Sequence, residues 1–421
     1  MNKCAPINAS NFRSLFNGIL SEELIWGIEV AATVFPFRSS NYIRDIIDWN
    51  NTSTDPLFRL TFPHPDMLSP SDFLELSDAL KKDGRCSKSV QEIVCRIRQE
   101  SNPHPAEQLS NIPTLNDVQL KGMQHKYKET VLFFPSQGQT CHSFCTFCFR
   151  WPQFVLSDIK FSAESPNELI DYLRIHPEVK NTLFTGGDPL VMRANNLASY
   201  LDPLTSANLT NLKEIRIGTK SLTYWPYRFL EDRDSDELLA LFERIVKRGY
   251  HLSIMAHVNH WKEMTEPFIQ AVKRIQSTGA IVRTQAPLMH HINDSADVWA
   301  KMWSQQVAIG MIPYYMFVPR DTGAQNYFAV SLDRAHSIFH DAYMQQSGLG
   351  RTARGPIMSA ASGKIELVGI NEIAGEKVFV LRLLQARDND LVLKPFFAKY
   401  DKDAIWINDL KPAFSEKFIF D

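Results

Sequence analysis

The sequence has no hydrophobic run long enough to cross a bilayer, for which about 18–20 apolar residues are needed. Even the segment VFVLRLL at 378–384 carries Arg382 in its middle. The first twenty residues also have no continuous apolar stretch of the kind found in secretory signals. The sequence therefore predicts a cytoplasmic protein with no membrane partner.

A large excess of one charge sign is also missing. The chain has 45 Lys and Arg against 47 Asp and Glu, which gives a formal net charge of −2. Proteins that bind nucleic acid usually present a basic surface, so we expect small-molecule partners instead. Hydrophobic residues make up 44% of the chain and charged residues 22%, as in globular proteins. Its 421 residues suffice for two or three domains, or for one large α/β domain with additions.

Cysteine is scarce and unevenly distributed. Three of the six cysteines lie within the eight residues 141–148, and none follows them. In a reducing compartment, clustered cysteines more often bind metals or take part in catalysis than form disulfides. We interpret the scattered cysteines (Cys4, Cys86 and Cys95) as ordinary thiols and the clustered ones as candidate ligands.

Three regions differ in their hydrophobic pattern, and we place their boundaries at 1–110, 111–349 and 350–421. The first contains apolar-periodic stretches that open at serines, which predicts capped amphipathic helices. It shows no catalytic motif, and the proline-rich segment 101–116 is typical of a linker. The last region contains two strand-like runs joined by NEIAG, which predicts a β-hairpin in a small C-terminal extension.

The middle region alternates strand-like and helix-like runs, which indicates an α/β fold with a parallel sheet. Either an open doubly wound sheet or a partial barrel would satisfy this alternation, and in both the chemistry lies at the carboxyl ends of the strands. The predicted strands are 131–135, 181–185, 214–219, 251–258, 281–288 and 313–318.

The clustered cysteines have the spacing C-x3-C-x2-C and follow the first predicted strand, at Cys141, Cys145 and Cys148. Three thiolates on one short loop can hold three irons of a cubane cluster. Because no fourth cysteine is near, one iron would keep an open position, which is typical of a catalytic metal site. Zinc with His142 as a fourth ligand, or three packed thiols without metal, are the alternatives.

This spacing, with the aromatic Phe147 before the third cysteine, resembles the radical S-adenosylmethionine (SAM) superfamily. A second motif, Thr185-Gly-Gly-Asp-Pro189, follows the second strand and is similar to the superfamily's SAM-binding turn; by itself it would be a tight turn. The resemblance implies a partial (β/α)6 barrel and a [4Fe–4S] cluster that cleaves SAM to a 5′-deoxyadenosyl radical. It also implies that SAM is lined by Gly186, Gly187, Asp188 and Gln285.

Further motifs over residues 120–370 resemble the lysine 2,3-aminomutase family. They are Cys148-Phe-Arg150, TGGDPL at 185–190, IRIGT at 215–219, HVNH at 257–260, Gln285 and PYY at 313–315. The resemblance implies pyridoxal phosphate (PLP) as a second cofactor and a shift of the amino group from C2 to C3 of an amino acid. Lys364, which follows Gly363 in a turn before a strand, would hold PLP, and Arg150 would bind the substrate carboxylate.

The sequence departs from this family at the PLP phosphate, where members commonly have RY-x-x-R. Here the stretch reads Lys126-Tyr-Lys-Glu-Thr130, so that Lys126 keeps one cation and the second arginine is lost. Arg351 and Arg354 are candidates to replace that arginine.

The second departure concerns the two aspartates that lysine-specific members place around the substrate ammonium. Arg320-Asp321 and Ile357 stand at those places. Burying an ammonium beside Arg320 and Ile357 would be costly, so we expect a substrate other than lysine; Arg320 could pair with an acidic distal group. Asn293-Asp294 opens a predicted helix and is interpreted as its N-cap.

Three hypotheses remain open at this point. The first is a PLP-dependent radical SAM aminomutase, an isomerase served by a reducing electron donor such as flavodoxin or ferredoxin. The second is a radical SAM enzyme of the same family that abstracts hydrogen without PLP. The third is a non-catalytic iron–sulfur or zinc-binding protein. The substrate and the oligomeric state are not specified by the sequence.

Overall fold

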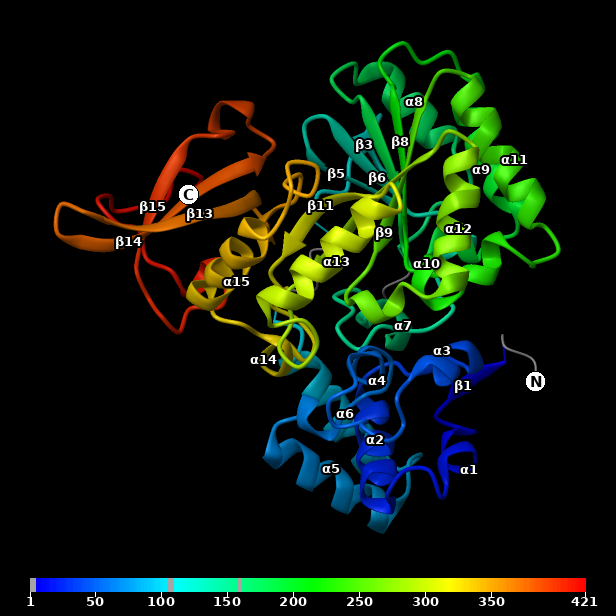
Figure 1. Cartoon of the computed structure of the whole chain (residues 1–421), viewed down its shortest axis with the longest axis vertical. Coiled ribbons are helices and arrows are strands. Elements are labelled where there is room, and N and C mark those ends of the chain that lie inside the picture. Colours follow the sequence, from blue (N-terminus) through cyan, green and yellow to red (C-terminus); the bar gives the residue numbers. More distant parts are fainter. Residues whose placement is uncertain (1–4, 104–109, 157–160) are drawn as a thin grey trace.

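The computed structural model describes residues 5–103, 110–156 and 161–421. Cys4 and part of the predicted linker, 104–109, lie outside these residues. The helices of the first hundred residues lie below a large sheet in Figure 1, and the last strands of the chain lie at the left, where they continue one edge of that sheet. No helix in the described parts of the chain is both long and apolar enough for a bilayer.

The N-terminal region is built mainly of helices, as its periodicity predicts. Ser21, Ser69 and Ser87 cap three of them, each accepting a hydrogen bond from a backbone N–H inside the first turn. The helices are α1 (Phe12–Phe16), α2 (Glu22–Val34), α3 (Asn41–Ile46), α4 (Pro56–Thr61), α5 (Pro70–Asp83) and α6 (Lys88–Glu100). Two short strands, β1 (Pro6–Asn8) and β2 (Arg38–Ser40), pair antiparallel. They bring the segment before α1 next to the segment after α2.

The large sheet has eleven strands among the described residues, and its central strands follow one another in chain order. All six predicted strands are present and run parallel, which confirms the α/β prediction. They are β6 (Thr130–Phe133), β7 (Asn181–Phe184), β8 (Glu214–Thr219), β9 (His251–His257), β10 (Ile281–Pro287) and β11 (Ile312–Phe317). β5 (Met123–Tyr127) pairs antiparallel with β6 at one edge, and β3 (Thr114–Leu115) with β4 (Val118–Gln119) forms a separate pair.

Helices connect these strands and pack their apolar sides against the sheet, around one large hydrophobic core. The N-cap prediction for Asn293 is wrong, because Ser295 occupies that position. Asn293 is buried and ties two strand ends together, donating to the carbonyls of Asn259 and Pro287. The helices are α7 (Pro152–Val155), α8 (Asn167–Ile175), α9 (Ala194–Ser206), α10 (Ser221–Tyr224), α11 (Ser235–Lys247), α12 (Glu266–Ser277), α13 (Ala296–Ala308), α14 (Gln325–Phe328) and α15 (Leu332–Met344).

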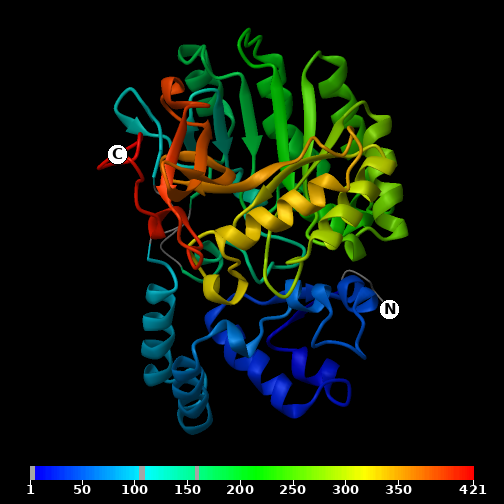
Figure 2. The same cartoon turned by 60° about the vertical axis from the view of Figure 1, so that its left-hand side comes forward.

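The C-terminal extension continues the same sheet. β12 (Arg354–Ala360) pairs parallel with β11, and β13 (Gly363–Ile373), β14 (Glu376–Gln385) and β15 (Pro395–Lys399) follow antiparallel. The predicted hairpin is confirmed as β13–β14, with its turn at Ala374 and Gly375, both at positive φ. Figure 2 shows these strands beside the parallel ones.

The N-terminal helices share one hydrophobic core with the carboxyl edge of the sheet. This core combines residues of α2 and α4 with Trp151, Tyr224 and Met289, each of which follows a parallel strand. The helical region therefore covers the edge at which an α/β fold places its active site.

Candidate active site

The three cysteines lie on one loop that follows β6 and touches the N-terminal helical region. The sulfurs are close enough to interact electrostatically. Cys145 and Cys148 raise the pKa of Cys141, and Cys145 raises the pKa of Cys148. Burial raises the pKa of Cys145 to about 11 and that of Cys148 to about 12, and it raises the pKa of Cys141 well above the usual range. Such thiols stay protonated at neutral pH unless a metal takes the place of the proton.

The loop fits a cluster in the type and number of its donors. Three thiols match the three irons that a site-differentiated cubane offers to protein ligands. Two further buried atoms of this loop, His142 Nε2 and Ser143 Oγ, have no hydrogen-bond partner in the described structure, which is expected where a bound group completes a site. The contacts found for His142 are with Trp225, Arg228 and Arg38. Among the described residues, no three His, Cys, Asp or Glu side chains are placed so that they could hold a single metal ion.

The glycines of the second motif pack against the residues directly before Cys141. A Cβ on Gly187 would lie 2.4 Å from the carbonyl oxygen of Thr140, and a Cβ on Gly186 would lie 2.3 Å from Gln139 Nε2. The N–H of Asp188 donates to Thr140 O at 2.7 Å. The turn thus lies beside the cysteine loop. Its glycines are needed because a side chain there would collide with Gln139 or Thr140.

The Asp188 carboxylate is buried and fully used by the protein. It accepts from the backbone N–H groups of Leu190 and Lys220 and from the hydroxyls of Thr219 and Ser221, at 2.8–3.0 Å. Burial raises its pKa, and these donors act in the opposite direction. Asp188 therefore fixes the end of β8 against the SAM-like turn.

Sequence reasoning missed an ion pair beside the cysteines. The Lys220 ammonium, at the end of β8, donates to Glu263 and to Asn259 Oδ1 at 2.8 Å, and it lies 4.5 Å from the centre of the Tyr224 ring. Both charged side chains are buried. The only signal in the sequence was the lysine directly after IRIGT, since its acidic partner lies more than forty residues later.

Gln285 lies next to a buried histidine on the neighbouring strand. Its Nε2 is 2.8 Å from His257 Nε2, and burial lowers the pKa of His257 to about 3, with Lys220 adding to the decrease. His257 is therefore neutral and can accept a hydrogen bond from the Gln285 amide. This pair connects the HVNH motif with the fifth predicted strand.

Lys364 is buried at the start of β13. Its ammonium nitrogen donates to Gln385 Oε1 and lies 4.6 Å from the Tyr127 ring centre and 5.1 Å from that of Tyr315. Burial lowers its pKa well below the usual lysine value, and Arg216 adds most to this among neighbouring charges. Burial and the neighbouring cations therefore favour the neutral form of this amine, which is the form that reacts with carbonyl groups.

Three cations surround Lys364: Lys126, Arg216 and Arg354 all lower its pKa. Arg216 was not predicted; it donates to Asn181 Oδ1 at 2.7 Å, and its Nη2 lies 3.5 Å from Thr130 Oγ1. Arg354 lies over the rings of two tyrosines on β11. Arg351 instead contacts Tyr343 and the carbonyl of Gln346, away from this cluster.

Arg150 and Arg320 lie close together. Arg150 is buried, with its guanidinium 4.3 Å from the Phe134 ring centre and 5.1 Å from that of Phe149. Arg320 lies 5.2 Å from the same Phe149 ring. Burial lowers the pKa of Arg150 to about 9, and Arg320 contributes in the same direction. Two neighbouring cations favour an anionic ligand.

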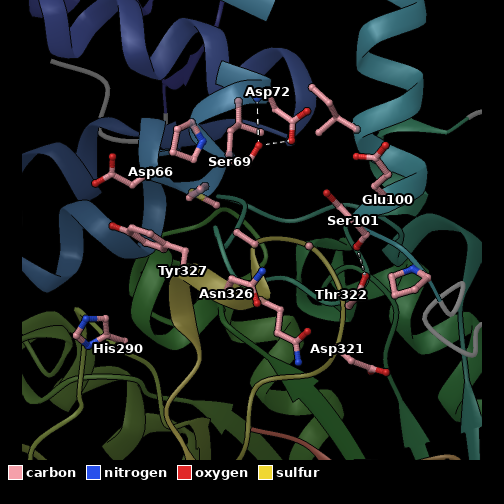
Figure 3. Close-up of a pocket in the computed structure, with 18 of the residues that line it drawn as sticks. Asp66, Ser69, Asp72, Glu100, Ser101, His290, Asp321, Thr322, Asn326 and Tyr327 are labelled. Atoms are coloured by element: carbon pink, nitrogen blue, oxygen red, sulfur yellow. Dashed lines mark hydrogen bonds between the residues drawn. The ribbon is translucent and has the colours of Figure 1, made fainter. Parts of the chain in front are cut away.

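Asp321 lines a cavity of about 580 Å³. Figure 3 shows Asp321, Thr322 and Ser101 on one side of this cavity and Asp66 and Tyr327 on the other. The cavity lies between the N-terminal helices and the loop after β11.

Comparisons with known proteins identify relatives of one kind. The chain is 28% identical over 390 residues to a protein of Aquifex aeolicus with the provisional name L-lysine 2,3-aminomutase, which covers 92% of this chain and 91% of that protein. It is 27% identical over 227 residues to the L-lysine 2,3-aminomutase of Escherichia coli, covering 54% and 63% of the two chains. It is 26% identical over 193 residues to the glutamate 2,3-aminomutase of Clostridioides difficile, covering 46% and 43%. No family model matches the chain.

These relatives confirm the resemblance to the lysine 2,3-aminomutase family. They also confirm the expectation of an enzyme, since aminomutases are isomerases. Among solved structures, the chain matches Streptococcus suis SuiB bound to S-adenosylmethionine with a TM-score of 0.36 and 13% identity, over 64% of this chain and 57% of that one. It matches SuiB bound to the precursor peptide SuiA with a TM-score of 0.37 and 11% identity, over 66% and 64%.

Proposed function

We propose that this protein is a radical SAM enzyme that moves the amino group of an amino acid from C2 to C3 with the help of PLP. The observation that carries the proposal is the buried Lys364 amine, which lies among cations on the same sheet that presents the cysteine loop. When bound, the [4Fe–4S] cluster supplies the electron that cleaves SAM, and PLP carries the migrating nitrogen. In this proposal the parallel strands curve into a partial (β/α)6 barrel around both cofactors.

The cysteine loop binds the cluster, and its neighbours hold SAM. Cys141, Cys145 and Cys148 are the iron ligands, and Gly186 and Gly187 bring the SAM turn against the loop. Asp188 acts by fixing this turn, because its carboxylate is used by internal donors. Gln285, which is hydrogen-bonded to His257, is the further residue that would line SAM.

Lys364 holds PLP, and the surrounding side chains orient it. A neutral amine is required for attack on the aldehyde, and burial favours the neutral form because it lowers the pKa of Lys364. Tyr127 and Tyr315 flank the amine with their rings. Lys126, Arg216 and Arg354 form a positive group suited to the phosphate, and Arg216 reaches Thr130, where relatives commonly carry the second arginine.

The substrate is an amino acid other than lysine, held by Arg150 through its carboxylate. Ile357 is fully buried where lysine-specific relatives have a carboxylate, and Arg320 stacks on the ring that also contacts Arg150. An ammonium at the distal end of the substrate would meet an apolar wall and a cation. A distal carboxylate or an uncharged group would not be repelled.

This function is tested by incubating the anaerobically reconstituted protein with SAM, a reductant, PLP and single amino acids labelled with ¹⁵N at C2. We expect β-amino products from acidic or uncharged amino acids and little or none from L-lysine. Efficient formation of β-lysine would overturn the substrate proposal. The same assay on Lys364→Ala should show no nitrogen migration while SAM is still cleaved.

A radical SAM reaction without PLP is the second candidate. The observation in its favour is Thr130, which replaces an arginine of the phosphate-binding pattern. Under this alternative, borohydride treatment of protein incubated with PLP leaves no phosphopyridoxyl group on Lys364, and Lys364→Ala turns over its substrate as well as the wild type.

A further inference from the structure

The N-terminal helical region, in which the sequence shows no catalytic motif, grips the cysteine loop from two sides. The carbonyl of Arg38 on β2 accepts a hydrogen bond from Phe144 N at 2.8 Å. The carbonyls of Arg59 and Leu60 on α4 accept from Thr146 Oγ1 at 2.7 Å and from Thr146 N at 3.0 Å. These bonds lie on either side of Cys145, so the path of the loop just before and just after its second cysteine is set by another part of the chain.

The Arg38 side chain reaches the first cysteine. Its Nη1 donates to Thr140 Oγ1 at 3.2 Å and to the carbonyl of Cys141 at 3.3 Å. Arg38 is half-buried, and no ion pair with an acidic side chain is found for it in the described parts of the chain. The guanidinium therefore lies directly beside the backbone of the first candidate ligand.

The cations near the other two cysteines are engaged elsewhere. Lys220 interacts with Cys145, but Glu263 balances its charge. Arg150 interacts with Cys148 and is assigned to the substrate carboxylate in the proposed function. Arg38 therefore brings to the cysteine loop, from the N-terminal region, a positive charge for which the described residues provide no acidic ion-pair partner.

We propose that Arg38 is a positioning residue of the iron–sulfur site, which orders the cysteine loop and makes the bound cluster easier to reduce. The inference rests on the proposed function, because it takes the loop to bind a [4Fe–4S] cluster. A cluster held by three thiolates is anionic, and its negative charge increases when one electron enters from a flavodoxin- or ferredoxin-like donor. No bond forms or breaks in that step, so a nearby cation acts by stabilising the reduced state.

Burial strengthens this effect. Cys145, Phe147 and Cys148 pack against the hydrophobic core of the N-terminal helices, so the helices exclude water from one side of the loop. In a site with less water, a charge at a given distance is screened less. The same packing explains why the charge of Arg38, on β2, can influence a cluster bound by the cysteine loop, which belongs to the α/β region.

The test is a redox titration, followed by electron paramagnetic resonance, of the full-length reconstituted protein without substrate. Arg38→Gln removes the charge and keeps a hydrogen-bond donor, and Arg38→Lys keeps the charge. Arg13→Gln is the matched control, because Arg13 lies in the same region and pairs with Glu22 and Glu29 on the surface. We expect the reduced fraction of the Arg38→Gln cluster at a fixed potential to fall about tenfold, equivalent to ~59 mV for one electron. Arg38→Lys and Arg13→Gln should match the wild type.

An unchanged midpoint potential in Arg38→Gln, with iron content equal to the wild type, would overturn the inference. If Arg38→Gln loses its iron, the ordering role is supported, and Arg38→Lys decides the role of the charge. A lowered potential in Arg38→Lys, with full iron content, would refute that role. Failure of the wild type itself to take up a cluster would overturn the proposed function, which is a different result.

Discussion

At the scale of single residues, burial lowers the pKa of Lys364, as the proposed attachment of PLP requires. An ordinary lysine has a pKa of about 10.4 and is almost entirely charged at neutral pH. The pKa of Lys364 is lowered well below this value, chiefly by burial, so the amine stays neutral to a lower pH than that of an exposed lysine. We therefore expect PLP to attach to Lys364 at a lower pH than it does to an exposed lysine.

The measurement is peptide mass spectrometry of the phosphopyridoxyl group after borohydride reduction at a series of pH values. A labelling midpoint near pH 10 would show that the amine is charged in solution. Lys377, which lies on β14 over Tyr400, provides an internal control for a lysine in contact with an aromatic ring. It should stay unlabelled at pH 7.5.

Gly187 tests how the SAM-like turn is held against the cysteine loop. A Cβ at this position would lie 2.4 Å from Thr140 O and 2.5 Å from Thr140 N, both of which are backbone atoms. Overpacking of this kind typically costs about 1–3 kcal/mol. We expect Gly187→Ala to lower thermal stability and to reduce the iron bound after reconstitution. Gly348→Ala, where a Cβ meets nothing within 4 Å, should change neither.

Single residues also show what sequence reasoning could reach. The three cysteines could be proposed as ligands from their spacing, and Lys364 could be proposed from its resemblance to the family's lysine turn. Arg216, Lys220 and Arg38 could not, since their partners lie 35 to 103 residues away in the chain. Only the folded sheet brings these groups together.

At the scale of elements, the Lys220–Glu263 ion pair connects the segment after β8 with the segment after β9. Side-chain exposure is 8% for Lys220 and 2% for Glu263. Removing one partner of a buried pair leaves an uncompensated charge and typically costs about 3–5 kcal/mol. We expect Lys220→Met to lower the free energy of unfolding by about this amount, as measured by urea denaturation.

Two variants control this prediction. Lys88→Met removes one partner of a surface pair with 90% and 69% exposure and should change stability by less than about 0.5 kcal/mol. Adding Glu263→Gln to Lys220→Met should restore part of the loss, because a neutral amide can still accept from the backbone of Asn259 and His260. A Lys220→Met protein as stable as the wild type would show that water reaches Glu263.

Element prediction succeeded where the hydrophobic pattern was continuous. The six parallel strands begin and end within about two residues of their predicted bounds. β12 was not predicted, because RGPIMSA contains a glycine and a proline that are typical of loops. It forms a strand because it has a parallel neighbour in β11 and an antiparallel one in β13, and such tertiary pairing is not visible in a single segment.

The whole molecule combines an α/β sheet, an N-terminal helical region over its carboxyl edge and a β extension that brings Lys364 to the same sheet. Cys148 and Lys364 are 216 residues apart in the sequence. One continuous sheet, from β6 to β13, connects the segments that carry them. The central claim is that this arrangement carries one cluster able to cleave SAM.

The most direct measurement of that claim is 5′-deoxyadenosine formation by the anaerobically reconstituted protein with SAM and dithionite. The wild type should bind about four irons and four sulfides and release 5′-deoxyadenosine. Cys141→Ala, Cys145→Ala and Cys148→Ala should each lose both properties, whereas Cys86→Ala, a change at an exposed cysteine, should keep them. A wild-type protein purified with stoichiometric zinc, which takes up no cluster and forms no 5′-deoxyadenosine, would contradict the account.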